Sequence, residues 1–333
     1  MSTNKRFEDL EQKLRTASIT SHTLIEEAVS FLGYSPMPQS LPLTFIRKIT
    51  DAARAGLKRK MPYDNGVLKI ARRYCNEGNR QIRLEKARCK RIGKQFPELL
   101  NYWNSQFYTT AAFINRQMAK QDHENGTTYL LSAYKNASRA MQSTQKNSPS
   151  PTNTKFLAFA YNQRAEIAMD ISRRARKETP FWIEKAISDS TEGAELFEKT
   201  DSRQAIFEYA NIVKEEWMLT KYFITQRDFE QKKDHAMKAV LNGEKCTELL
   251  ENHEDKELSI PLRHFYFNLA RSYRALYDCT TEDNYREKAC KNFERFIKLM
   301  PPQDKMRYEA QDTLEYLQKI KASSKLPACP SPK

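Results

Sequence analysis

The stretch that decides the fold is FYFNLARSYRALYDCTTEDNYREKACKNFERFIKLMP, residues 265–301. In each half, large and small apolar residues recur at intervals of three and four, so they share one face of a helix. These residues are Tyr266, Leu269, Ala270 and Tyr273, followed by Ala289, Phe293, Phe296 and the closing Pro301. The pattern predicts two amphipathic helices that pack against each other.

The second of these helices has counterparts upstream. Four alanines lie 53, 53 and 50 residues apart, and a ring precedes each of them by four positions. The alanines are Ala133, Ala186, Ala239 and Ala289, and the rings are Tyr129, Trp182, His235 and Tyr285. A small residue lets a neighbouring helix approach closely, and the ring fills the space beside it. From about residue 100 onward, the sequence therefore predicts stacked helix pairs that bury their faces against one another.

This alternation of large and small positions resembles the tetratricopeptide repeat, in which a proline also closes the unit. The resemblance is clearest in residues 259–301 and weaker in residues 100–258. Two features depart from the family pattern: additional residues around CTTEDNY are expected to separate the helices, and Phe296 replaces the usual alanine. The resemblance implies an all-α fold of stacked antiparallel helix pairs forming a tetratricopeptide-like superhelix. It also implies a concave face that binds an extended peptide or a partner protein.

A second resemblance is local. The segment LLSAYKN, residues 130–136, is similar to a helix segment of the phosphopeptide-binding 14-3-3 proteins, which are also stacked helical hairpins. The resemblance implies a phosphate-binding role for Lys135 and Arg139, with Arg164 and the pair Arg173–Arg174 as further candidates.

The composition agrees with an all-α fold. The 333 residues include only eight glycines, about a third of average usage, and strands, bulges and phosphate-binding loops all consume glycine. No run approaches the roughly 18 apolar residues of a membrane span, and the first twenty residues lack the apolar stretch of a secretory signal. We therefore expect a protein of the cytoplasm or the nucleus.

The sequence contains no signature of catalysis, metal binding or cofactor binding. The six cysteines form no Cys-x-x-Cys pair, the five histidines are dispersed, and the motifs of nucleotide-binding loops, α/β-hydrolases and zinc proteases are missing. His235 occupies the ring position of its repeat, so packing explains it, and the pair Glu215–Glu216 stands among residues typical of a surface. We expect a non-enzymatic protein with no catalytic residue, no metal and no cofactor.

Prolines and changes in composition divide the chain. YSPMPQSLP has three prolines in nine residues and cannot continue a helix, and the pair Gly78–Asn79 is expected to interrupt the helix in which it stands. The predicted organisation is N-terminal helices at 1–33, a linker at 34–42, a basic helical region at 43–98, a repeat domain at 99–322 with a linker at 143–155, and a disordered tail at 323–333.

The net charge of +14 is concentrated in one block. Residues 46–94 contain sixteen Lys or Arg and only four Asp or Glu, whereas the rest of the chain is close to neutral. A concentrated charge produces a local field that attracts anions. The block therefore predicts a binding surface for a negatively charged partner.

The basic block includes a helix with two contrasting sides. When residues 80–96 are placed on a helix, six cations fall within an arc of about 140°. They are Arg80, Arg83, Lys86, Lys90, Arg91 and Lys94, and the apolar side carries Ile82, Cys89, Ile92 and Phe96. The charge is extended by the upstream cations Lys58, Arg59, Lys60, Lys69, Arg72 and Arg73. Like charges at this spacing repel one another, so an anionic partner would offset the repulsion.

The predicted partner of these cations is RNA, single-stranded DNA or another polyanion, bound through its phosphates. Nearby aromatic rings could stack unpaired bases, but the helical spacing of Trp103, Phe107 and Tyr108 favours core positions for them. The alternative function is that of a pure protein-interaction adaptor, whose basic patch binds an acidic protein segment. The simplest interpretation is that the cationic side of this helix is exposed to solvent and serves only solubility.

Overall fold

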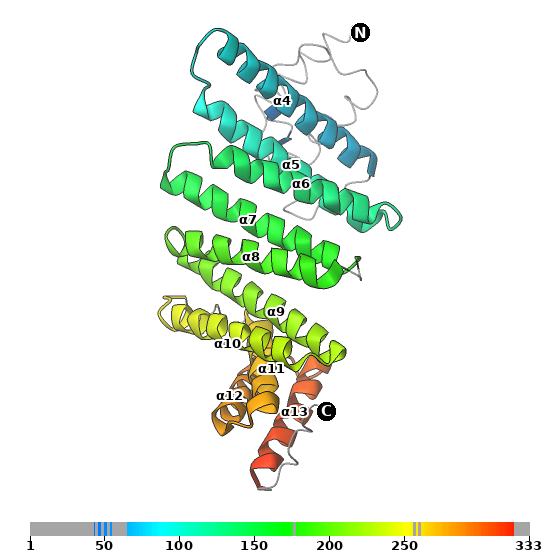
Figure 1. The fold of residues 1–333 in the computed structure, drawn as a ribbon, viewed down its shortest axis with the longest axis vertical. Coiled ribbons are helices and arrows are strands. Elements are labelled where there is room, and N and C mark those ends of the chain that lie inside the picture. The colour runs from blue at the N-terminus through cyan, green and yellow to red at the C-terminus, as the bar shows by residue number, and fades with distance from the viewer. Residues whose placement is uncertain are drawn as a thin grey trace. The chain divides into compact units, whose positions relative to one another are not determined.

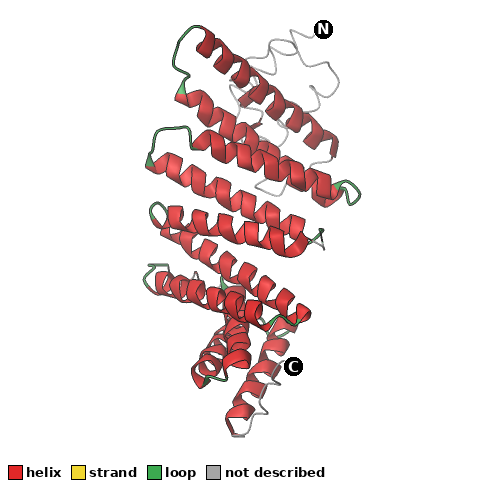
Figure 2. Ribbon diagram, viewed as in Figure 1, coloured by secondary structure: helices red, strands yellow, loops and turns green. Residues whose placement is uncertain are grey.

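The described part of the chain is built from helices. The structure is a computed structural model. It describes residues 65–322 except 176, 177, 256, 257, 259 and 260, together with Leu43, Ile46, Arg47, Thr50, Asp51 and Arg54. Within these residues there are ten helices labelled α4 to α13 and no strand (Figures 1 and 2). None of these described helices is long and apolar enough to cross a membrane. The predicted all-α fold class is confirmed.

The first of two compact units comprises residues 1–175. Its described helices are α4 (Asn65–Arg91), α5 (Glu98–Gln121), α6 (Gly126–Thr144) and α7 (Pro151–Ser172), and each packs against the next in an antiparallel arrangement (Figure 1). A buried apolar cluster joins α4 to α5, with Leu68 and Cys75 on one helix and Ala111, Ile114 and Met118 on the other. This cluster fixes which side of α4 remains available to solvent.

The second unit comprises residues 176–333. Its helices are α8 (Thr179–Glu198), α9 (Ser202–Gln226), α10 (Phe229–Glu251), α11 (Arg263–Thr280), α12 (Asp283–Leu299) and α13 (Lys305–Ala322). Each packs against the next, and α9 also contacts α11. In stacked helix pairs the first helix of one pair meets the first helix of the next. The contacts therefore identify α9–α10 and α11–α12 as successive pairs, and the prediction of stacked pairs is confirmed.

The four repeated alanines stand on alternate helices. Ala133 lies on α6, Ala186 on α8, Ala239 on α10 and Ala289 on α12, and all four are completely buried. Gly243, four residues after Ala239, is also closely packed. A Cβ placed on it would lie 2.4 Å from the side chain of Leu269 on α11. The repeat read from the sequence thus marks buried positions on every second helix from α6 to α12.

The last pair shows one error in the sequence interpretation. The apolar positions of α11 and α12 are buried as predicted, and the ring of Phe267 stacks on Phe296 with centroids 4.7 Å apart. The additional residues around CTTEDNY, however, do not separate the helices. Only Thr281 and Glu282 lie between α11 and α12, so the additional residues lengthen the two helices instead. Thr281 makes the reversal possible because it adopts a left-handed conformation with φ of 58°.

Local side chains define several helix starts. Ser150 accepts a hydrogen bond from the backbone N–H of Asn153 at 3.1 Å, and Pro151 occupies the first turn of α7. Asp201 and Asp228 cap α9 and α10 in the same way. Such caps satisfy backbone donors that a helix start leaves free. The connection between α6 and α7 is consequently short, covering only residues 145–150 of the predicted linker at 143–155.

Helix α4 continues through Gly78–Asn79, so the predicted interruption is wrong. Gly78 is buried against α5, where a Cβ would lie 2.5 Å from the ring of Phe107. Glycine at this position therefore permits close packing between the helices and does not end α4. The helix ends at Arg91, where Gly93 has φ of 64° and the N–H of Lys94 bonds to the carbonyl of Cys89 at 3.0 Å.

Several predicted segments lie outside the described residues. They are the helices at 1–33, the linker at 34–42, the tail at 323–333 and the cluster Lys58, Arg59 and Lys60. The boundary predicted between residues 98 and 99 stays a prediction.

Candidate nucleic-acid interface

The continuous course of α4 aligns more cations than the sequence interpretation expected. At 100° per residue, seven basic side chains of α4 fall within an arc of about 100° and span about 33 Å along the helix. We call this set the cationic stripe; it consists of Lys69, Arg72, Arg73, Arg80, Arg83, Lys90 and Arg91. All of its members are exposed except Arg72, which is partly buried. The buried side of α4 faces the opposite direction, toward α5.

Few carboxylates compensate this charge. Arg80 forms an ion pair with Glu77 at 2.7 Å, and Arg88, outside the stripe, lies 3.5 Å from Glu85. Hydrogen bonds from Arg80 lower the pKa of Glu77, which is therefore charged at neutral pH. In the described part of the chain, the other six members of the stripe have no ion pair with a carboxylate. If carboxylates of the fold neutralised these cations, the polyanion interpretation would fail. In the described residues, these six cations are not neutralised in this way.

Part of the charge also suits the helix itself. Lys90 and Arg91 stand in the last turn of α4, where the helix dipole favours positive charge. Lys69, Arg73 and Arg83 lie in earlier turns and gain nothing from this effect. A structural role in the helix therefore accounts for only one end of the stripe.

Two predicted members of the basic face, and one of the apolar side, differ from the helical projection. The ammonium group of Lys86 lies over the ring of Phe96, 5.6 Å from its centroid, at the edge of the stripe. Lys94 lies beyond the end of α4, on the loop that leads to α5. Ile92, which was expected on the apolar side, is 53% exposed because the helix ends before it.

The neighbouring aromatic rings provide little surface for base stacking. Tyr74 is buried, and Phe107 is buried beside Gly78 of α4. Tyr102 contacts Phe156 edge-to-face at 4.9 Å, and Arg47 covers Trp103 at 5.0 Å. Any nucleic acid on α4 would therefore be held by its phosphates more than by its bases.

The candidate phosphate-binding residues of the 14-3-3 resemblance have different surroundings in the fold. Lys135 and Arg139 are exposed on α6, whereas the guanidinium of Arg164 lies over the rings of Tyr134 and Tyr161 at 5.5 and 5.8 Å. The pair on α7 is engaged elsewhere: Arg173 donates to Asp170, and Arg174 donates to backbone carbonyl groups.

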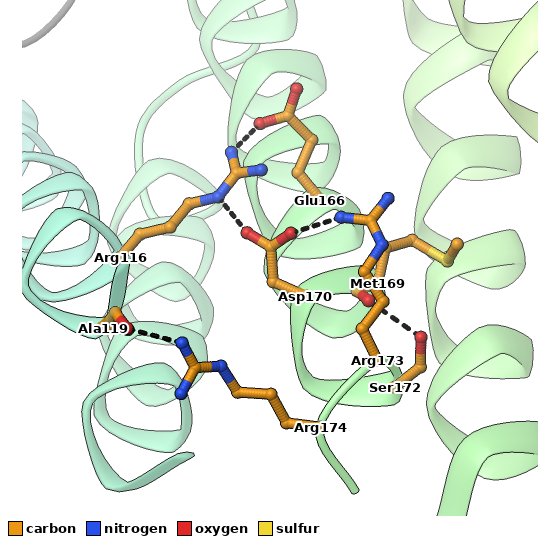
Figure 3. A network of polar contacts seen from close by, with 8 residues as sticks. All are labelled: Arg116, Ala119, Glu166, Met169, Asp170, Ser172, Arg173 and Arg174. Atoms are coloured by element: carbon orange, nitrogen blue, oxygen red, sulfur yellow. Dashed lines mark hydrogen bonds and ion pairs between the residues drawn. The ribbon is translucent and has the colours of Figure 1, made fainter. Parts of the chain in front are cut away.

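A polar network that the sequence did not disclose fixes α7 to α5 (Figure 3). Arg116 on α5 donates to both Glu166 and Asp170 of α7, with Nε 2.5 Å from the Asp170 carboxylate. Arg174 donates to the carbonyl oxygen of Ala119 at 2.6 Å, near the end of α5. The acidic pair stands one helical turn apart, but the arginine lies about fifty residues upstream. Only the tertiary fold brings these groups together, so no local signal could have revealed them.

The pair Glu215–Glu216 is buried, which corrects the prediction that it lies on the surface. A carboxylate oxygen of Glu216 and Nδ1 of His235 form a hydrogen bond of 2.7 Å, and the His235 ring stacks on Phe223. Burial raises the pKa of Glu215 to about 8, with smaller contributions in the same direction from Glu216 and Asp189. Lys214 and the Ser190 hydroxyl act in the opposite direction. In the described residues this cluster offers no group of three side chains that could hold a metal ion.

Comparisons with known proteins give no family assignment. None of the protein-family models matches the chain, and no curated protein matches it by sequence. Among solved structures, BtubC (BKLC) from P. vanneervenii is similar at 15% identity, with 97% of this chain and 96% of that chain covered and a TM-score of 0.44. The S. pombe nuclear import adaptor Nro1 is similar at 12% identity, covering 93% and 95%, with a TM-score of 0.45. Yeast Tom70 is similar at 9% identity, covering 96% and 79%, with a TM-score of 0.19. The fold assignment rests on the chain's own helices.

Proposed function

We propose that the chain is a non-enzymatic helical-repeat scaffold whose cationic stripe binds RNA or single-stranded DNA through phosphate groups. The observation that carries this proposal is the row of cations along one face of α4, most of them exposed and, apart from Arg80, without an ion pair in the described part of the chain. Repulsion between cations at helical spacing destabilises the free helix, and bound phosphates would relieve it.

The shape of the stripe favours a polyphosphate over an acidic protein segment. Seven cations over about 33 Å correspond to one charge per roughly 5 Å, a linear density that only a long acidic run in a protein would match. Five of the seven are arginines, whose planar guanidinium groups suit phosphate oxygens well.

Packing on α5 also favours a single strand over a duplex. A recognition helix enters the major groove of DNA with much of its circumference exposed. One side of α4 is covered by α5, so only the stripe side is available. A flexible single strand can follow such a straight row, with little discrimination between base sequences.

We assign the protein or peptide partner to the repeat array. Stacked helix pairs present extended surfaces, and this is the usual role of such repeats. A scaffold of this kind would bring a protein and a nucleic acid together on one chain. The alternative, an adaptor whose stripe grips an acidic protein segment, uses the same cations and is an outcome of the experiment that follows.

The experiment measures the affinity for a fluorescently labelled 20-nucleotide polyuridylate RNA by anisotropy. The triple variant Arg73→Glu, Arg83→Glu and Lys90→Glu is expected to bind at least about 30-fold more weakly, since three phosphate contacts become repulsive. The control variant carries the same change of charge at Lys221, Lys233 and Lys305, which are exposed residues of the second unit. It should bind within about threefold of the wild type.

Circular dichroism must show that both variants keep the helicity of the wild type. Equal losses in the two variants would mean that net charge, and not the stripe, causes binding. Displacement of the RNA by polyglutamate at matched charge concentration would instead support the adaptor.

A further inference from the structure

A cavity of about 520 Å³ opens between α5 and α7, away from the cationic stripe. Three phenylalanine rings supply its apolar lining: Phe113 from α5, and Phe156 and Phe159 from α7. Phe159 is 41% exposed, although it is a large apolar side chain. A cavity of this size and character is typical of sites that hold a small organic molecule.

One wall of the cavity carries an unsatisfied acceptor. Gln163 is only 4% exposed, and its amide nitrogen donates to the carbonyl oxygen of Thr109 at 3.1 Å. Its amide oxygen has no hydrogen-bond partner in the described part of the chain. Buried polar atoms without partners are rare in folded proteins, because losing water without a replacement is unfavourable. A rotation of the Gln163 side chain toward the cavity would let an N–H or O–H group of a ligand satisfy this oxygen.

A second wall carries a cation that has no direct ion pair among the described residues. The Nε atom of Arg54 is buried and has no hydrogen-bond partner, and burial lowers the pKa of this guanidinium. Among the described residues Arg54 forms no ion pair within 4.0 Å, although Asp51 is near enough to favour its charge. The acidic residue in the lining, Glu166, is already bound by Arg116. The cavity therefore has a positive charge, only partly offset by Asp51, beside an apolar lining.

We propose that this cavity binds a small amphipathic carboxylic acid. The apolar or aromatic part of the acid lies among the three phenylalanine rings, and its carboxylate pairs with Arg54. A donor on the ligand bonds to the amide oxygen of Gln163. This site is independent of the nucleic-acid proposal, because it uses other residues and another kind of ligand.

Indole-3-butyrate is a suitable probe, since it combines an aromatic ring, one N–H donor and a carboxylate on a short chain. Its methyl ester keeps the ring and the donor but lacks the charge. Saturation-transfer NMR on the full chain should show that the acid binds with a dissociation constant below about 1 mM and the ester at least about fivefold more weakly. No saturable binding of the acid at 5 mM would overturn the proposal.

Two variants locate the site. Arg54→Met should remove the preference for acid over ester, and Gln163→Leu should weaken both ligands while leaving that preference in place.

Phe159→Ala should weaken binding at least about fivefold, whereas Phe229→Ala, which removes a 63% exposed ring of the second unit, should not. Equal effects of the two alanine variants would reveal non-specific adsorption and contradict the proposal. Because Arg54→Met could disturb folding, the acid-to-ester ratio in the wild type provides a second test that needs no variant.

Discussion

At the residue scale, Glu215 is a carboxyl group in an unfavourable place. It is 2% exposed on α9, and one of its oxygens has no hydrogen-bond partner in the described part of the chain. Burial raises its pKa to about 8, compared with 4.5 for an ordinary glutamate. The folded protein therefore retains a proton that the unfolded chain loses between these two values. It follows that Glu215 destabilises the fold as the pH rises from about 5 to about 8, and does not do so below that range.

Glu215→Gln should remove this pH dependence. We expect the variant to melt at least about 3 °C above the wild type at pH 8, and within about 1 °C of it at pH 5. Differential scanning calorimetry across this range measures the difference directly. Glu195→Gln, which neutralises an exposed carboxylate on α8, is the matched control. A difference in melting temperature that is the same at pH 5 and pH 8 would show that Glu215 is already charged in the folded protein.

The buried residues also show why sequence reasoning succeeded at some positions and failed at others. The alanines on alternate helices were found because small size and regular spacing leave a local pattern in the sequence. Glu215 and Glu216 left none, since two adjacent glutamates are usual on a surface, and their burial depends on contacts with α8 and α10. Arg116 likewise meets its partners only after about fifty intervening residues have folded.

At the scale of elements, α5 and α7 are held together by the Arg116 network. Arg116 and Asp170 are 20% and 15% exposed, so the ion pair is shielded from solvent but not fully desolvated. Its loss would remove the arginine from Glu166 and leave Asp170 paired with Arg173 alone. The network thus sets the spacing of the two helices that also line the cavity.

Arg116→Gln should lower the free energy of unfolding by about 1–3 kcal/mol, between the values for exposed and buried pairs. Urea denaturation measures this loss, and hydrogen exchange should show faster exchange in the C-terminal half of α7. Lys120→Gln, at an exposed position of α5, serves as the control. If the two variants unfold at the same urea concentration, the network contributes nothing to stability.

Helix α4 shows how one glycine changed the interpretation of an element. Gly78 and Asn79 are common at helix ends, so the sequence favoured an interruption there. In the fold, the missing side chain of Gly78 makes room for Phe107, and the helix continues. The cations upstream and downstream of Gly78 consequently lie on one face. The sequence therefore predicted the charge correctly but underestimated how well it is aligned.

At the scale of the whole molecule, the sequence was sufficient to predict a helical-repeat scaffold, because its repeat and its low glycine content both reflect the same packing. It was not sufficient to locate the cavity or the buried acidic cluster. These features combine residues from separate helices, and their chemistry arises from burial. The cationic stripe is an intermediate case. Its residues were predicted from the sequence, but only the structure shows which of them are exposed.

The most direct test of the central claim is the salt dependence of RNA binding by the wild-type chain. Association constants for the polyuridylate RNA would be measured by anisotropy from 50 to 300 mM KCl. If about five phosphates are neutralised along the stripe, the logarithm of the association constant should fall with a slope of about −3.5 against the logarithm of the salt concentration. An affinity that is unchanged across this range would contradict phosphate binding by α4.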